Sequence, residues 1–157
     1  MKSKIEKLVA HALNNPVKIV CGDVGEANSD VEQSIYVLPS AQDKFNWLLS
    51  RYVKMCTEGK LLVFVTKKSD AEDLAKKMRQ RDAELVLLHG DQHQSTRSEQ
   101  ITAFRGKVPM MVATDVAARG LDIAEIRNVV NFDVARDIDT HVHRVGRTGR
   151  AGRVEHI

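Results

Sequence analysis

The chain has 157 residues, of which 43% are hydrophobic and 29% are charged, and its formal net charge is +3. This length and composition predict one globular domain with its own core, and they exclude a disordered chain. The weak positive charge permits an anionic partner, but only the placement of the charges can identify one. No apolar run approaches the ~18 residues that span a membrane, and no signal-peptide pattern opens the chain, so we expect an intracellular protein.

The cysteines and two neighbouring histidines give no indication of a metal site. Cys21 and Cys56 lie far apart in the sequence and form no CxxC pair. Neither a disulfide framework nor a zinc site is therefore expected. His141 and His143 do not suit a shared metal ion, because residues two apart on a helix point away from each other.

The first thirty residues differ from the rest of the chain. Residues 3–13 have a short helical pattern that the Asn14-Asn15-Pro16 segment interrupts, and residues 21–30 are polar and contain glycine. Such a segment is typical of a loop or linker. We therefore expect residues 1–30 to lie outside the domain and residues 31–157 to form it.

From residue 31 onward, short β-rich runs alternate with helical patterns. The predicted strands are residues 35–38, 61–65, 85–88, 110–113 and 128–131, and the predicted helices are residues 43–55, about 95–105 and 138–145, with a further helix from residue 69. Ser69 is predicted to be the N-cap of that helix, with Glu72 completing a capping box and Leu74, Ala75 and Met78 facing the core. This alternating order predicts an α/β fold: a parallel sheet with helices on both faces.

Polar residues follow three of these strands. They are Thr66-Lys67-Lys68, His89-Gly90-Asp91 and Thr114-Asp115. Ligands of such sheets bind outside the carboxyl ends of the strands, so these clusters predict one binding edge. Each cluster alone could equally be a turn or a helix cap, and Lys67 and Lys68 could be plain surface charge.

An arginine–glycine run follows the last predicted strand. In residues 143–150 (HRVGRTGR), Arg144, Arg147 and Arg150 recur at three-residue steps around Gly146 and Gly149. A guanidinium matches phosphate oxygens bidentately, and glycine lets a large anion approach the backbone. The run therefore suits a polyphosphate, and the alternative is a solvated basic loop.

These motifs together resemble those of the DEAD-box RNA helicases of superfamily two. Residues 113–122 (ATDVAARGLD) and 143–150 resemble the family's fifth and sixth motifs, and residues 63–68 (VFVTKK) look like its fourth. Residues 89–91 (HGD) and 94–97 (QSTR) resemble two elements between them. The motifs occur in family order, and the resemblance covers essentially residues 1–156. Residues 134–141 (VARDIDTH) and the segment 22–30 look closest to a subgroup linked to pre-mRNA splicing and RNA annealing, which implies a nuclear setting, with the cytoplasm as the alternative.

The resemblance implies the second RecA-like lobe of a two-lobe motor with a fold like that of P-loop NTPases. Residues 1–30 would be the tail of the first lobe and the interdomain linker. In the family, ATP lies between the lobes and single-stranded RNA crosses both. Arg147 and Arg150 would be arginine fingers that reach the γ-phosphate. Asp122 would bind the ribose of ATP beside Gly120, and His143 and Arg144 would couple to acidic residues of the first lobe.

The resemblance also implies an RNA-binding set. Thr66, Gly90, Gln94, Arg97 and Thr114 would lie along the RNA backbone. Such contacts recognise phosphate, sugar and strand shape rather than base sequence. The residues themselves agree, because this edge offers no aromatic stacking platform and only 4% of the chain is aromatic.

The chain also departs from the family pattern. It has no GxxxxGK[ST] loop and no Asp-Glu-Ala-Asp sequence for Mg²⁺, elements that the family carries on its first lobe. ATP and Mg²⁺ are therefore expected as ligands held largely by that lobe. The family continues beyond the arginine–glycine run with another strand and helix, so we expect the domain to be truncated there. Gln92 stands where many members have a basic or apolar residue, which puts an RNA contact at that position in doubt.

Other interpretations stay open for single residues and for the whole. Arg119 could form a salt bridge with Asp115 or Asp122, and Gln94 with Arg97 could be an ordinary pair at a helix start. The function predicted from the resemblance is that of an ATP-dependent RNA helicase lobe, with a first lobe, RNA and ribonucleoprotein components as partners. The alternatives are a non-catalytic RNA-binding module and a DNA-directed helicase lobe.

Overall fold

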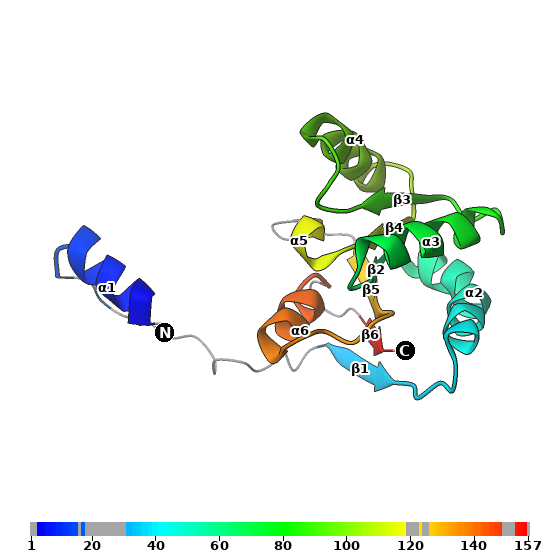
Figure 1. Cartoon of the computed structure of the whole chain (residues 1–157), viewed down its shortest axis with the longest axis horizontal. Coiled ribbons are helices and arrows are strands. Elements are labelled where there is room, and N and C mark those ends of the chain that lie inside the picture. The colour runs from blue at the N-terminus through cyan, green and yellow to red at the C-terminus, as the bar shows by residue number, and fades with distance from the viewer. Residues whose placement is uncertain are drawn as a thin grey trace.

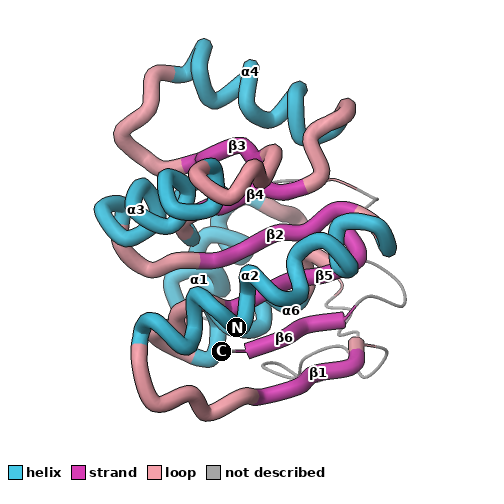
Figure 2. The backbone as a smooth tube through the Cα atoms, turned by 90° about the vertical axis from the view of Figure 1, so that its right-hand side faces the viewer, coloured by secondary structure: helices cyan, strands magenta, loops and turns pink. Residues whose placement is uncertain are grey.

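The computed structural model describes residues 3–15, 17, 31–118, 123, 126–148 and 153–156. A six-stranded sheet with the strand order β1-β6-β5-β2-β4-β3 forms its centre, and every neighbouring pair is parallel (Figures 1 and 2). The strands are β1 (Glu32–Ile35), β2 (Lys60–Phe64), β3 (Leu85–Leu88), β4 (Met110–Ala113), β5 (Ile126–Asn131) and β6 (Arg153–His156). The helices are α1 (Ser3–Ala12), α2 (Ala41–Glu58), α3 (Lys68–Arg79), α4 (Gln94–Arg105), α5 (Asp115–Ala118) and α6 (Ile138–Val145). The predicted α/β fold with a parallel sheet is confirmed.

Helices cover both faces of the sheet, which explains the continuous apolar run of its central strand. Leu61 and Val63 of β2 pack in one core with residues of α2 and α3. Leu62 and Phe64 point to the opposite face and pack with residues of α4, α5 and α6. Because successive side chains of a strand alternate between faces, a strand covered on both sides must be apolar throughout. All five residues of β2 are accordingly buried.

The edge strand β1 begins three residues earlier than predicted. Its pairing with β6 joins Glu32 to Arg153 and Ile35 to His156, whereas Val37 lies beyond the ladder and is 94% exposed. The apolar run at residues 35–38 therefore predicted the wrong bounds for this strand, because hydrogen bonds to β6, and not burial, determine which residues form it. β6 itself was missed, since four partly polar residues carry no strand pattern, and it provides a strand where we expected truncation.

The predicted capping box of α3 is wrong. The helix begins at Lys68, its N-cap is Lys67, and no side chain caps it. Ser69 Oγ instead donates a hydrogen bond to Asp70 Oδ1 at 2.9 Å. The carboxylate of Glu72 lies 3.3 Å from His89 Nε2 and 3.9 Å from Lys68 Nζ. The predicted core face of this helix is confirmed, since its three predicted core residues are buried.

Two absences hold for the described residues. No helix among them is long and apolar enough to cross a membrane. The same residues contain no group of three or more His, Cys, Asp or Glu side chains that could hold a metal ion.

Candidate functional site

The polar residues that follow β2, β3 and β4 lie at one edge of the sheet, as the parallel topology requires. Thr114 is nearly buried, and its backbone N–H donates to Leu88 O at 3.1 Å, which ties the end of β4 to the end of β3. Gly90 is exposed, and a Cβ at this position would lie 3.9 Å from Val116 Cγ1. Crowding therefore does not demand a glycine here, and the exposed backbone at Gly90 remains accessible from outside.

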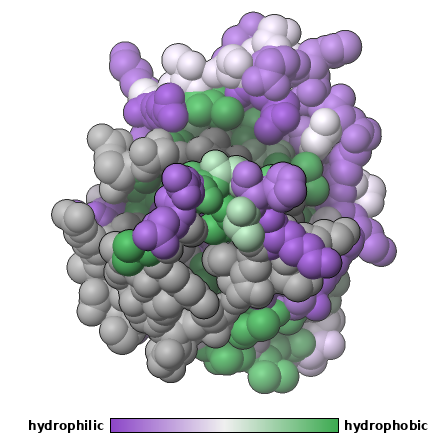
Figure 3. Space-filling view, turned by 90° about the vertical axis from the view of Figure 1, so that its left-hand side faces the viewer, coloured by the Kyte–Doolittle hydropathy of each residue, from purple (hydrophilic) through white to green (hydrophobic). Residues whose placement is uncertain are grey.

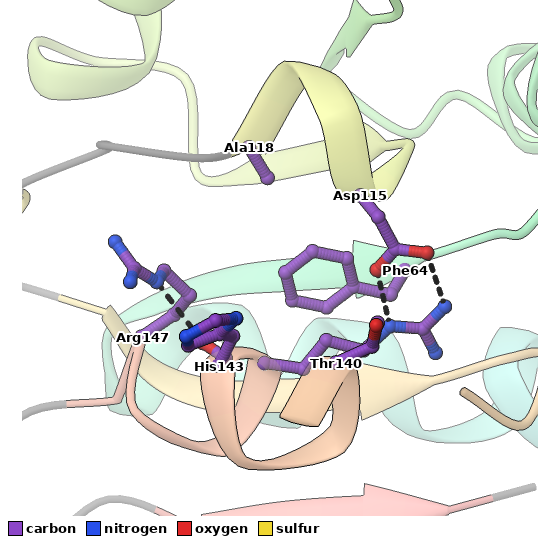
Figure 4. Close-up of a pocket in the computed structure, with 7 residues that line it drawn as sticks. Phe64, Asp115, Ala118, Thr140, His143 and Arg147 are labelled. Carbon is purple, nitrogen blue, oxygen red and sulfur yellow. Dashed lines mark hydrogen bonds and ion pairs between the residues drawn. The ribbon is translucent and has the colours of Figure 1, made fainter. Parts of the chain in front are cut away.

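A pocket of about 220 Å³ lies at the same edge, between α5 and α6 and over the end of β2. It is lined by Phe64, Asp115, Ala118, Thr140, His143, Arg144 and Arg147. Figure 4 shows the Phe64 ring in the middle, with Ala118 and Asp115 on one side and residues of α6 on the other. The structure thus brings residues of the two long motifs together around one cavity, which we call the arginine pocket.

Arg144 is held inside the domain. Its side chain is 1% exposed, and its Nε and Nη2 donate to the two carboxylate oxygens of Asp115 at 2.6 and 2.9 Å. Its Nη1 donates to Asn131 Oδ1 at 3.1 Å and to Asp133 O at 2.6 Å. This differs from our expectation that Arg144 meets acidic residues of another lobe, because the bidentate pair with Asp115 already neutralises its charge. Asp115 binds Arg144, and the Arg119 that we considered as its partner lies outside the described residues.

Arg147 lies one turn further along and faces the arginine pocket. Its Nε donates to the carbonyl of His143 at 3.1 Å, and Figure 4 shows its guanidinium directed away from the Asp115 side. His143 is exposed at the rim. The other predicted nucleotide residues, Gly120, Asp122 and Arg150, lie outside the described residues.

Thr66, at the end of β2, is held by a residue that sequence reasoning missed. Its backbone N–H donates to Asp133 Oδ2 at 2.9 Å, and Asp133 Oδ1 accepts from Lys44 Nζ at 3.1 Å. Asp133 follows β5 just as the predicted polar clusters follow their strands. The signal that could have found it is therefore the same one: a polar residue directly after a buried strand.

Charged residues of α3 clamp the loop after β3. Lys68 Nζ lies 2.8 Å from Asp91 Oδ2 and 3.9 Å from Glu72 Oε1. The hydrogen bond and charge of Asp91 raise the pKa of Lys68, and Lys68 lowers the pKa of Asp91 in the same way. His89 adds a second contact to Glu72 at 3.3 Å. Lys68 is therefore more than plain surface charge, since it connects α3 to the loop that carries Gly90.

Gln92 binds backbone within its own loop. Its Oε1 accepts from His89 N at 3.2 Å, and its Nε2 donates to Leu87 O at 3.0 Å. Both ends of the amide thus hold the turn after β3. The absence of a basic residue at this position is explained by this bracing contact.

The first turn of α4 presents the remaining two predicted RNA residues. Gln94 is exposed and Arg97 is half-buried, and no hydrogen bond joins their side chains in the described structure. Within the same residues, Arg97 Nε has no hydrogen-bond partner. The two are therefore not an ordinary helix-start pair. Figure 3 shows that the surface around α4, at the top of the view, is mostly hydrophilic.

On α6, the environment of His141 differs from that of free histidine. Partial burial, and secondly the charge of Arg144, lower its pKa. Its Nε2 lies 3.1 Å from Gln33 Oε1, which connects α6 to the edge strand β1. His141 thus contributes to packing beside the arginine pocket.

Comparison with known proteins agrees with this site. Residues 43–152 match the family described as helicase conserved C-terminal domain. ATP-dependent RNA helicase DDX42 of Xenopus laevis is 57% identical over 152 residues, which are 96% of this chain and 16% of that protein. DEAD-box ATP-dependent RNA helicase 24 of Oryza sativa is 45% identical over 153 residues, or 97% of this chain and 20% of that protein. The chain thus spans only a small part of these relatives.

Solved structures show the same fold. The DEAD-box protein SrmB of E. coli, bound to regulator of ribonuclease activity A, has a TM-score of 0.75 and 34% identity, covering 82% of this chain and 78% of that one. Dbp5 of S. cerevisiae, bound to RNA and ADP BeF3, has a TM-score of 0.81 and 28% identity, covering 100% of this chain and 43% of that one. The arrangement of both long motifs around one pocket, the family match and these structures agree: the chain belongs to the DEAD-box helicases and is a RecA-like helicase C-terminal domain.

Proposed function

We propose that this chain is the second lobe of an ATP-dependent RNA helicase, which binds the RNA backbone and completes an ATP site held by a first lobe. The observation that carries the proposal is the arginine pocket, which presents Arg147 beside a fully neutralised Arg144 at the binding edge. Relatives that share most of this chain's length are named ATP-dependent RNA helicases, and the Dbp5 structure holds RNA and ADP BeF3. We extend these properties to the present chain.

The two arginines of α6 have different parts in this mechanism. Arg144 positions the helix, because its bidentate pair with Asp115 fixes α6 against α5. Arg147 donates a hydrogen bond from Nε to the carbonyl of His143, and its side chain lines the arginine pocket. An arginine aimed at a transferring phosphoryl group stabilises the charge that develops in the transition state. We assign this role to Arg147, together with Arg150, and ribose binding to Asp122 beside Gly120.

Other groups complete the site in the two-lobe protein. We place the ligands of Mg²⁺ on the first lobe, where the ion would supply positive charge to the phosphates of ATP. His143 lies exposed at the pocket rim, where it can contact that lobe. Hydrolysis by in-line attack of water thus requires both lobes, so we expect the isolated chain to show no ATP turnover.

The RNA part of the proposal concerns Thr66, Gly90, Gln94, Arg97 and Thr114. These residues follow β2, β3 and β4 or begin α4, so they lie along the same edge as the arginine pocket. Backbone amides, hydroxyls and a guanidinium suit phosphate and sugar, which predicts binding without base specificity. Prp28, a yeast DEAD-box splicing factor, has a similar structure, with a TM-score of 0.75 and 32% identity over 100% of this chain and 35% of that one. We propose pre-mRNA splicing and the nucleus as the setting.

The first test replaces Arg147 with alanine in a two-lobe protein that carries this chain as its second lobe. Loss of an arginine finger should lower RNA-stimulated ATP turnover by about 10³-fold or more. The assay measures phosphate release at saturating ATP and RNA, with thermal unfolding as the check on folding. Arg81→Ala removes an exposed arginine that lies after α3 and serves as the matched control.

The outcomes separate the proposed function from its alternatives. Near-normal turnover of Arg147→Ala would contradict the assignment. RNA binding without ATP turnover in the unmodified two-lobe protein would favour a non-catalytic module. Equal stimulation by RNA and by DNA of the same sequence would point to a DNA-directed enzyme.

A further inference from the structure

Asp133 connects the two halves of the binding edge. It follows β5, and its hydrogen bonds reach three other elements or their ends. The side chain accepts from the backbone of Thr66 at 2.9 Å and from Lys44 Nζ at 3.1 Å. The backbone carbonyl accepts from Arg144 Nη1 at 2.6 Å, and the backbone N–H donates to Phe64 O at 3.3 Å. One residue therefore contacts both the predicted RNA residue Thr66 and the arginine pocket.

The carboxylate extends the sheet ladder past the end of β2. The register pairs of β2 and β5 end at Phe64 with Asn131, so the Thr66 N–H lies beyond the strand pairing. The side chain of Asp133 supplies an acceptor for this N–H. A hydrogen bond from an amide to a carboxylate is charge-assisted and stronger than a neutral one. This contact consequently fixes the orientation of the Thr66 peptide at the binding edge.

Lys44 completes the arrangement from the other side. Its ammonium lies 3.1 Å from the Asp133 carboxylate and 4.7 Å from the centre of the Phe132 ring, and both charged side chains are about a quarter exposed, at 24% and 27%. The pair ties the first turn of α2 to the edge. The positive charge binds Oδ1, while Oδ2 binds Thr66, so the two contacts can be separated by substitution.

We propose that Asp133 is a positioning residue, whose side chain orients Thr66 for RNA and whose main chain holds Arg144 beneath the arginine pocket. This inference rests on the proposed function. Because side chain and carbonyl belong to one residue, a shift of the β5 end moves both contacts together. Replacing the side chain, however, releases Thr66 and leaves the carbonyl bond to Arg144 in place.

The test uses Asp133→Ala in the two-lobe protein that carries this chain. We expect the RNA concentration for half-maximal ATP turnover to rise about tenfold, the size expected from loss of a hydrogen bond to a charged group. The turnover number at saturating RNA and the affinity for nucleotide without RNA should stay close to those of the unmodified protein. Asp133→Asn keeps an acceptor for the Thr66 N–H and should restore most of the RNA affinity.

Two further variants distinguish positioning from a structural role. Lys44→Met removes the ion pair but leaves the bond to Thr66, so its RNA requirement should stay near that of the unmodified protein. Asp73→Ala removes an exposed acid of α3 and controls for net charge. The inference is overturned if Asp133→Ala binds RNA normally, or if Asp133→Ala and Lys44→Met lose thermal stability, turnover and RNA affinity together. Absence of RNA stimulation in the unmodified protein would instead refute the proposed function, and this inference with it.

Discussion

Arg144 and Arg147 lie three residues apart in the same motif, yet their surroundings assign them different tasks. Arg144 is 1% exposed and bound bidentately to Asp115, whereas Arg147 lines the pocket with its Nε bound to backbone. Removing one member of a buried ion pair costs about 3–5 kcal/mol, because the other charge is left without compensation. Loss of Arg144 would therefore impair folding, and only Arg147 offers a clean test of phosphate chemistry.

Cys56 allows a prediction from its surroundings alone. Burial raises the pKa of its thiol from 9.0 to about 11. Since the thiolate is the reactive form, alkylation by iodoacetamide at pH 8 should be about 100-fold slower in the folded chain than in the urea-unfolded chain. Peptide mass spectrometry follows Cys56 separately from Cys21. Because folding raises this pKa, the thiol of Cys56 loses its proton in the unfolded chain before it does so in the folded chain. Cys56 therefore leaves the free energy of unfolding unchanged below pH 9 and lowers it as the pH rises from 9 to 11.

Steric shielding would also slow the alkylation of Cys56, so the pH profile decides between the two causes. A raised pKa predicts that the alkylation rate of Cys56 in the folded chain rises with pH along a titration curve whose midpoint lies near pH 11. A midpoint near pH 9 with a uniformly low rate would show that access alone is restricted, and would contradict the desolvation of the thiol.

Helix α6 contributes Thr140, His143 and Arg144 to the lining of the arginine pocket, and its first turn is stabilised by an N-cap residue. Asp137 caps it in an extended conformation, and its side chain accepts from Thr140 N at 2.7 Å. Asp137→Ala should lower the free energy of unfolding by about 1 kcal/mol, the typical value of an N-cap, as measured by urea denaturation of the chain. Asp137→Ser should recover most of this loss.

Ser69→Ala is the matched control, because the structure shows that Ser69 does not cap α3. Its effect should stay within about 0.5 kcal/mol, the range of ordinary surface substitutions. A loss of the same size at Ser69 and Asp137 would contradict the difference between the two helix starts.

The contrast between α6 and α3 shows what local sequence can specify. Residues 138–145 were predicted as a helix and form one with these bounds, because an acidic cap and an apolar face act locally. The start of α3 could not be predicted from its local pattern, since Glu72 contacts His89 from the end of another strand and no side chain caps the helix. The buried strands β2, β3 and β4 followed from composition, whereas β1 and β6 depend on each other's hydrogen bonds. In the candidate site, the roles of Arg144 and Asp133 likewise arise from contacts between segments distant in sequence.

At the scale of the whole molecule, the order β5-β2-β4-β3 arranges the strand ends that carry the site in one row. Asp133, Thr66, Thr114 and Gly90 therefore follow each other along a single edge, with the arginine pocket beside them. In the proposed function, this chain supplies one side of each ligand site and the first lobe supplies the other. Binding of RNA and of ATP should consequently each favour closure of the same two lobes.

Closure of this kind predicts reciprocal coupling in the two-lobe protein. A non-hydrolysable ATP analogue should raise the affinity for single-stranded RNA by a factor of about 5–150, and RNA should raise the affinity for the analogue by the same factor, because linkage makes the two effects equal. Fluorescence titrations of labelled RNA and of labelled nucleotide measure both. The isolated chain should bind RNA equally with and without the analogue, since it lacks the other half of the nucleotide site. Identical RNA affinity in the two-lobe protein with and without the analogue would show that the arginine pocket and the RNA edge act independently, and would contradict a composite site completed by Arg147.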